Sequence, residues 1–304
     1  VGSFCYNSPE SAYPVYFVAK VNKAAPSYGI WQQPEVHKGV EAQWMWYNGQ
    51  VRLKEQFARE VVGDSIGAYF RYQFDKEETV ELKVGISYVS IANARENLYR
   101  EIGDKSFDEV YATARINWND ALHARVEGGT EDQKTIFYTG LYHALLHPNL
   151  LNDVNGDFPE NSTNKIGKNK ERYTVFSLWD TYRNYHPLMT LLYPDQQLQM
   201  VRTMLDIYKE SGWLPKWELN STETFTMVGD PASIVIADTY LRGLTDFDIH
   251  TAYEAMLKGA NTLEDNPIRP GVEEYWKNGY LSVDGGIRGP VSTTQEYNIA
   301  DFAI

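Results

Sequence analysis

The first part of the chain alternates apolar and polar residues with the two-residue period of half-buried β-strands. The alternation is clearest over residues 14–20, 67–74 and 79–86, which are separated by turns containing Gly, Pro and Asp. We therefore predict that residues 1–88 form the C-terminal part of a β-sandwich domain. Because these strands are few and the sequence opens directly on one of them, we expect an earlier part of the sandwich to precede it.

After Ser90 the apolar residues recur with a period near 3.6, which predicts helices. Residues 89–126 contain two amphipathic segments that we interpret as linker helices, the first ending at Gly103. Further helices are predicted to begin at a series of capping residues, namely Thr130, Ser177, Asp195, Asp230, Asp248 and Ser292. Repeated helix pairs after a β domain are typical of an α/α toroid, so we predict that residues 127–304 form the first part of one, whose loops at one end build a concave site.

Composition narrows the classes of partner. The 304 residues include 28 Lys and Arg against 41 Asp and Glu, which gives a formal charge of −13. The sequence contains no basic stretch that could bind along a phosphate backbone, which argues against a nucleic-acid partner. No run of about 18 apolar residues predicts a membrane span. Aromatic residues make up 14% of the chain. That proportion fits either a pocket that stacks against sugar rings or an unusually aromatic core.

The strongest candidate chemistry lies at the start of the helix that follows Ser177. Trp179, Asp180 and Arg183 occupy its first turns, and a spacing of three places the aspartate and the arginine on one face. An indole can stack on a pyranose, a carboxylate can accept hydrogen bonds from two hydroxyls, and a guanidinium can hold that carboxylate and donate to another oxygen. The alternative is a buried helix start in which Asp180 interacts with the helix dipole and Arg183 only pairs with it.

Two other acids lie where function concentrates. Glu223 belongs to a long polar loop over residues 213–229, and long loops in a compact domain often carry function. Glu296 lies in the first turn of the last predicted helix, where it either faces a site or interacts with the helix dipole. Asp153, Asn155 and Asp157 alternate as in an EF-hand, but the loop lacks its later glycine and glutamate, so we predict a polar turn.

Several motifs in fixed order carry a family resemblance. The segments FYTGLYHALLHPNLLNDVNGDF, FSLWDTYRNYHPLMTLLYP, MVGDPASIVIADTYLRG and TTQEYNIADFAI are similar to those of glycoside hydrolase family 92, the calcium-dependent exo-α-mannosidases, over nearly the whole chain. The resemblance implies an N-terminal β-sandwich followed by an (α/α)6 barrel. It also implies an exported, periplasmic or extracellular enzyme that hydrolyses terminal α-mannosides of glycans, many members cutting α-1,2 linkages, with inversion and with Ca²⁺ as cofactor.

The resemblance assigns roles residue by residue. It places Trp179, Asp180 and Arg183 in or beside the mannose subsite, with Asp180 as the main ligand of the sugar hydroxyls. Glu296 and Glu223 are further candidates for substrate binding. In the family the general acid, the base and the calcium ligands follow the last motif. We therefore expect them beyond Ile304, assign no metal ligand within this chain, and expect a fragment that is inactive alone. A non-catalytic carbohydrate-binding module and a helical scaffold are the alternatives.

Overall fold

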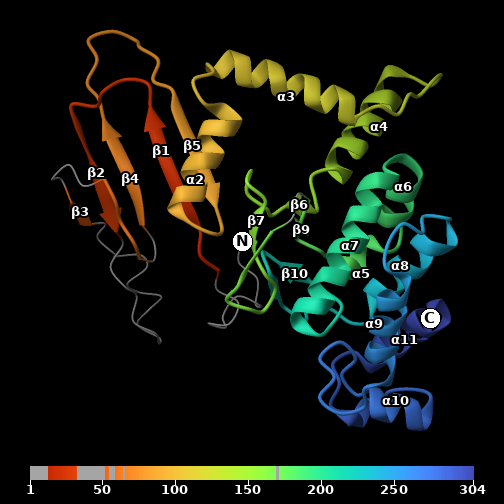
Figure 1. The fold of residues 1–304 in the computed structure, drawn as a ribbon. Coiled ribbons are helices and arrows are strands. Elements are labelled where there is room, and N and C mark those ends of the chain that lie inside the picture. Colours follow the sequence, from red (N-terminus) through yellow and green to blue (C-terminus); the bar gives the residue numbers. More distant parts are fainter. Residues whose placement is uncertain (1–12, 33–51, 55–58, 64–65, 169–170) are drawn as a thin grey trace. The chain divides into compact units, whose positions relative to one another are not determined.

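The computed structural model describes residues 13–32, 52–54, 59–63, 66–168 and 171–304. The chain divides into two compact units (Figure 1). One unit spans Phe17–Gly85 and is built from strands; the other contains Ile86–Ile304 together with the described residues just before Phe17, and is mainly helical.

The β unit contains two small sheets, formed by β1 (Tyr16–Val21), β2 (Ser27–Gln32), β3 (Arg52–Lys54), β4 (Ile66–Arg71) and β5 (Leu82–Ser87). In one sheet β2 lies between β3 and β4 and is antiparallel to both, and in the other β1 neighbours β5. The three predicted strands correspond to β1, β4 and β5. Neither β2, whose sequence SYGIWQ interrupts the alternation with a glycine, nor β3 was predicted from the sequence.

Apolar side chains from both sheets line a cavity of about 520 Å³ in the β unit. Trp31 of β2 reaches into it beside Gly67 of β4, and a β-carbon at residue 67 would collide with the indole ring. Only glycine leaves room for the indole ring at this position, which explains why a glycine occurs within β4.

The helical unit begins with two linker helices. The first, α2 (Ile91–Asn97), continues as the π-helical turn η3 (Leu98–Ile102) and ends before Gly103, as predicted. The second, α3 (Phe107–Ala121), starts with a capping box between Ser106 and Glu109 and has no buried residue. Ser90 caps α2 by accepting a hydrogen bond from the backbone N–H of Asn93.

The remaining helices are α4 (Glu131–Ala144), α5 (Leu178–Thr181), α6 (Tyr185–Leu192), α7 (Pro194–Ser211), α8 (Pro231–Leu241), α9 (Ile249–Asn261), α10 (Val272–Asn278) and α11 (Pro290–Ala303). Short strand pairs lie in the loops: β6 (Asn149–Leu150) with β9 (Tyr173–Thr174), β7 (Asp157–Pro159) with β8 (Ile166–Lys168), and β10 (Glu218–Leu219) with β11 (Thr222–Glu223). The sequence patterns did not predict these strands or α10.

The core of the helical unit surrounds α8. This helix packs against α5, α6, α7 and α11 (Figure 1), and α9 packs against α7. The sequence of α8 is apolar on nearly all sides, which is typical of a central helix. The main cluster includes Met200, Met204 and Leu205 from α7 and Val235 and Ile236 from α8. No helix in the described ranges is long and apolar enough to cross a membrane.

The predicted helix starts were only partly right. Thr130 and Asp248 cap α4 and α9 through their side chains, as expected. Ser177 and Asp230 occupy cap positions but make no capping hydrogen bond. Asp195 lies inside the first turn of α7, whose proline starts the helix.

The predicted capping box at Ser292 is wrong, because α11 starts two residues earlier at Pro290. Proline supplies the helical φ angle without needing the N–H that a first-turn residue leaves unpaired.

The predicted single helix after Ser177 is two helices. Four residues form α5, and α6 starts at Tyr185. A continuous helix would require the nitrogen of Pro187 to donate to the carbonyl of Arg183. Proline has no N–H and its ring collides with that carbonyl, so the helix is interrupted between Thr181 and Tyr185.

Candidate functional site

One carboxylate of α11 contacts side chains of α5 and of the turn that follows it. The Glu296 side chain accepts hydrogen bonds from Trp179 Nε1 at 3.1 Å, from the Tyr182 hydroxyl at 2.9 Å and from Arg183 Nη2 at 2.6 Å. The contact with Arg183 is also an ion pair. Glu296 itself is only 8% exposed. We call Trp179, Tyr182, Arg183 and Glu296 the Glu296 cluster.

The guanidinium of the Glu296 cluster lies over two aromatic rings. Arg183 Cζ is 5.0 Å from the ring centroid of Trp179 and 4.6 Å from that of Tyr182. Its Nη1 also donates to the Tyr182 hydroxyl at 2.8 Å. Arg183 is exposed and Trp179 is half-buried, so a planar cation and an indole reach solvent while the carboxylate beneath fixes both.

Gly229 brings the start of α8 against this cluster. Its φ angle is +90°, and a β-carbon there would lie 2.8 Å from the Glu296 β-carbon. Only glycine combines the positive φ with so close an approach. The loop before α8 therefore ends directly beside the residues of α5 and α11 that form the cluster.

Asp180 is exposed, next to Trp179 on the single turn of α5. Partial desolvation raises the pKa of its carboxyl, and the positive charge of Arg183 opposes that rise. The predicted direct pairing of Asp180 with Arg183 is wrong, because Arg183 makes its ion pair with Glu296 instead. The helix ends at Thr181, so the two residues do not share the regular helical face that the spacing implied. The alternative of a buried helix start holds for Leu178, which is fully buried, but not for Asp180, which reaches solvent.

Glu223 lies in the loop before α8 and binds the backbone of that loop. Its carboxylate accepts hydrogen bonds from the backbone N–H groups of Lys216 at 2.8 Å, Trp217 at 2.9 Å and Phe225 at 2.8 Å. Burial raises the pKa of the Glu223 carboxyl. Of the predicted site residues, Trp179, Arg183 and Glu296 are thus in mutual contact and Asp180 adjoins them. Glu223 holds the backbone of the neighbouring loop.

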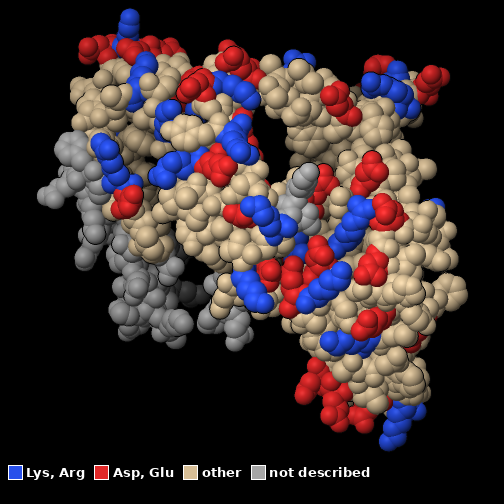
Figure 2. All heavy atoms as spheres, viewed as in Figure 1, with Lys and Arg blue, Asp and Glu red and all other residues tan. Residues whose placement is uncertain are grey.

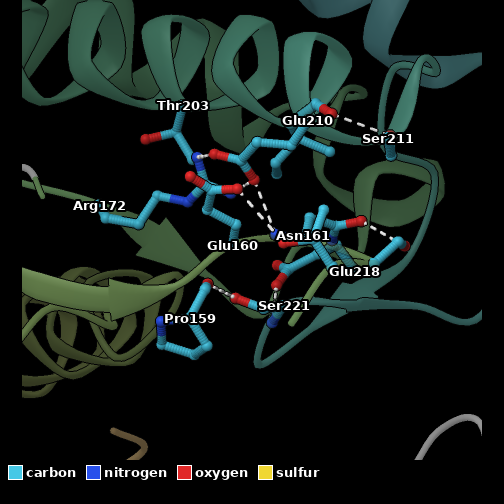
Figure 3. A network of polar contacts seen from close by, with 12 residues as sticks. Pro159, Glu160, Asn161, Arg172, Thr203, Glu210, Ser211, Glu218 and Ser221 are labelled. Carbon is cyan, nitrogen blue, oxygen red and sulfur yellow. Dashed lines mark hydrogen bonds and ion pairs between the residues drawn. The ribbon is translucent and has the colours of Figure 1, made fainter. Parts of the chain in front are cut away.

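A buried polar network, which the sequence patterns did not reveal, holds the loops around α5 (Figure 3). Arg172 is 1% exposed and donates to both oxygens of Glu210, at 3.0 and 2.7 Å. The same carboxylate accepts from the backbone N–H of Asn161 at 2.7 Å. A planar guanidinium with two parallel bonds to one carboxylate fixes orientation as well as distance.

Glu218 belongs to the same region and fastens two loops together (Figure 3). Its buried carboxylate accepts from the Thr174 hydroxyl and from the backbone N–H groups of Val175 and Ser221. Burial raises the pKa of Glu218 to about 7. The backbone carbonyl of the same residue accepts from the N–H of Phe176 at 2.9 Å. The segment that leads into α5 therefore lies alongside the loop that precedes α8, held to it by these hydrogen bonds.

The candidate metal loop is a polar turn, as predicted. Asp153 is buried and accepts hydrogen bonds from Ser87, Asn93 and Asn97 at 2.6–2.8 Å, so its oxygens are occupied by protein donors. Within the described ranges, no group of three or more His, Cys, Asp or Glu residues could hold a metal ion. The residues of this turn do not fit a calcium site.

On the surface, acidic and basic side chains are interspersed on the face shown in Figure 2. Several surface charges of the helical unit pair directly, among them Arg202 with Asp246 and Arg242 with Asp238. The negative formal charge of the chain is therefore not expressed as one acidic field over this face.

Two family profiles match the chain. The glycosyl hydrolase family 92 catalytic domain matches residues 93–304, and the family 92 N-terminal domain matches residues 1–87. The chain belongs to glycosyl hydrolase family 92. A family 92 α-mannosidase from Bacteroides thetaiotaomicron, solved in complex with mannoimidazole, is 28% identical and superposes with a TM-score of 0.79 over 95% of this chain and 36% of its own.

Further relatives agree with this assignment of the fold. A family 92 inverting mannosidase from Bacteroides thetaiotaomicron is 24% identical, with a TM-score of 0.81 over 98% of this chain and 41% of its own. An uncharacterized secreted glycosidase from Arthroderma benhamiae is 26% identical in an alignment of 257 residues that covers 78% of this chain and 29% of that protein. The chain thus spans about two fifths or less of the length of these family 92 proteins.

Proposed function

We propose that the protein to which this chain belongs is an exported exo-α-mannosidase that removes terminal, α-1,2-linked mannose from glycans with inversion and with calcium as cofactor. In this proposal the β unit is part of a β-sandwich and the helical unit is the first part of an (α/α)6 barrel. The observation that carries the proposal is the Glu296 cluster, which presents an indole and a guanidinium to solvent beside an exposed carboxylate. The likeness to an α-mannosidase that binds mannoimidazole supports it.

Each exposed group of the site has a task toward one sugar ring. The indole of Trp179 stacks on the apolar face of the terminal mannose, and Asp180 accepts hydrogen bonds from two of its hydroxyls. Arg183 donates from the N–H groups that Glu296 and Tyr182 leave free. Because Glu296 already fixes the indole and the guanidinium, little side-chain entropy is lost when the sugar binds.

The acid and base of an inverting hydrolysis must come from other residues. Such a reaction needs two carboxyl groups roughly 6.5–9.5 Å apart, one to protonate the leaving oxygen and one to activate water. Asp230 and Asp301 are both held by Arg269, with its Nε 3.1 Å from Asp230 Oδ2 and its Nη1 2.5 Å from Asp301 Oδ1. We assign these two acids to structure, and expect the acid and base beyond Ile304.

The test is Asp180→Asn in the full-length protein, assayed by release of mannose from α-1,2-mannobiose. Two hydrogen bonds to a charged carboxylate are worth about 1.5–3 kcal/mol each, so we expect kcat/KM to fall by roughly 10² to 10⁴. The melting temperature should change little, since Asp180 is exposed. Asp246→Asn, which alters an exposed acid in a surface ion pair, is the matched control and should keep full activity.

Near-normal activity of Asp180→Asn would remove this residue from the site. If the unaltered full-length protein binds mannosides without turning them over, the site belongs to a carbohydrate-binding module instead. Loss of activity on adding a chelator, restored by Ca²⁺, would support the proposed cofactor.

A further inference from the structure

The loop that leads into α8 contains strained backbone next to the cluster. Among the described residues, seven that are not glycine have a positive φ angle, and four of them lie in this loop. Asn220 (48°) and Ser221 (67°) form the two-residue turn between β10 and β11, where such angles are usual, whereas Phe225 (50°) and Met227 (67°) lie outside that turn. Such conformations cost of the order of 1–3 kcal/mol each and persist where the surrounding structure enforces them, commonly at functional sites.

The strain is enforced by specific hydrogen bonds. Glu223 accepts from the backbone N–H of Phe225, and the hydroxyl of Thr224 donates to the carbonyl of Trp217 at 2.8 Å. The same carboxylate fixes the backbone of Trp217. The loop is therefore held in one shape by its own side chains, and residues 225 and 227 project from a fixed backbone.

What the loop presents to solvent is apolar. Phe225 is 43% exposed and Met227 is 47% exposed. A strained backbone that served only to fill the core would bury these two large side chains. Their exposure on a rigid loop instead suits contact with a ligand, because aromatic and thioether groups cover the apolar face of a ring.

The position of the loop relates it to the Glu296 cluster. Gly229 lies against Glu296. Met227 is two residues before Gly229, so the Cα atoms of Met227 and Gly229 lie within about 7.6 Å of each other. By the same measure Phe225 lies within about 15 Å of Gly229. Both residues are thus near the cluster without being members of it, at a separation that suits the sugar next to the one the cluster binds.

We propose that Phe225 and Met227 contact the leaving-group sugar, the hexopyranose to which the terminal mannose is attached, and thereby determine which glycosides the enzyme prefers. The inference rests on the proposed function. It assigns recognition of the terminal sugar to the Glu296 cluster and recognition of the next ring to the strained loop. Glu223 is then a positioning residue, which acts through the backbone of Phe225.

The test compares two substrates that share the terminal sugar. Phe225→Ala and Met227→Ala are made in the full-length protein and assayed with α-1,2-mannobiose and with α-mannosyl fluoride, whose leaving group is too small to reach the loop. For mannobiose we expect kcat/KM to fall about tenfold or more, on the scale of one lost apolar contact, mainly through a higher KM. For the fluoride the change should stay below about twofold, because the contacts to the terminal sugar are intact.

Two further variants complete the design. Phe225→Asn removes the ring and retains a residue that tolerates a positive φ angle, so it keeps the loop shape if alanine does not. Leu241→Ala removes an exposed apolar side chain, 78% exposed, at the opposite end of α8 and should change neither activity.

Equal losses on both substrates, or no loss on mannobiose, would overturn the inference while leaving the proposed function intact. An unaltered full-length protein that hydrolyses neither substrate would overturn the proposed function, and this inference with it.

Discussion

Replacing Gly229 by alanine tests whether the loop before α8 packs on Glu296. Gly243, at the other end of the same helix, has the same φ angle of +90° but no atom within 4 Å of an added β-carbon, so it is a matched control. An L-residue in left-handed backbone costs about 1–2 kcal/mol, and the stiffer unfolded chain returns about 0.4–1 kcal/mol. We therefore expect Gly243→Ala to lower the free energy of unfolding by about 1 kcal/mol.

Gly229→Ala carries the same backbone cost and a steric one. Its β-carbon would meet the Glu296 β-carbon at 2.8 Å, and that atom cannot swing aside as the end of a flexible side chain could. Overpacking of this kind typically costs about 1–3 kcal/mol, so the total loss should be about 2–4 kcal/mol. Because Glu296 holds Trp179 and Arg183, its displacement should also lower mannosidase activity, whereas Gly243→Ala should leave activity unchanged.

Thermal and urea unfolding of the two full-length variants, with kcat/KM on α-1,2-mannobiose, give the required comparison. Equal destabilisation by the two substitutions, or equal activity, would show that Gly229 does not pack on Glu296 in solution.

Two other predictions concern the buried network. Arg172→Met leaves the buried Glu210 carboxylate without its cation and should destabilise the protein by about 3–5 kcal/mol. The control Arg202→Met, which removes a surface ion pair with Asp246, should cost less than about 1 kcal/mol. Similar melting temperatures of the two variants would contradict this prediction. The pKa of Glu218 is about 7 in the folded protein and near 4.5 when unfolded, so the folded state binds more protons between these pH values. The unfolding free energy should therefore fall as pH rises from about 4.5 to 7. If the unfolding free energies of Glu218→Gln and of the unaltered protein, plotted against pH, run parallel over this range, the raised pKa of Glu218 is refuted.

The fold was predictable where local sequence determines it. The strands β1, β4 and β5 followed from alternation, and Asp248 marked the start of α9 by a cap that the structure contains. The interruption between α5 and α6 was also written in the sequence, because Pro187 cannot continue a helix from Leu178. It was missed because the apolar period runs unbroken across it.

The site was predictable only in its composition. Trp179, Asp180 and Arg183 are close in sequence, and their grouping could be inferred from that. The partner of Arg183 could not, because Glu296 lies 113 residues away and only tertiary packing brings it near. Arg172 and Glu210 are likewise 38 residues apart, and no local pattern distinguishes a buried arginine from an exposed one.

The distance along the chain between Trp179 and Glu296, 117 residues, also sets an order of assembly. During synthesis α5 leaves the ribosome long before α11 exists, so its indole and guanidinium have no carboxylate to anchor them. Their arrangement arises only when α11 docks beside α8, so these groups gain their affinity for a ligand only after α11 has been made. A ligand that binds the anchored groups would in turn stabilise the docked helix, which couples recognition to the packing of α11 on α8.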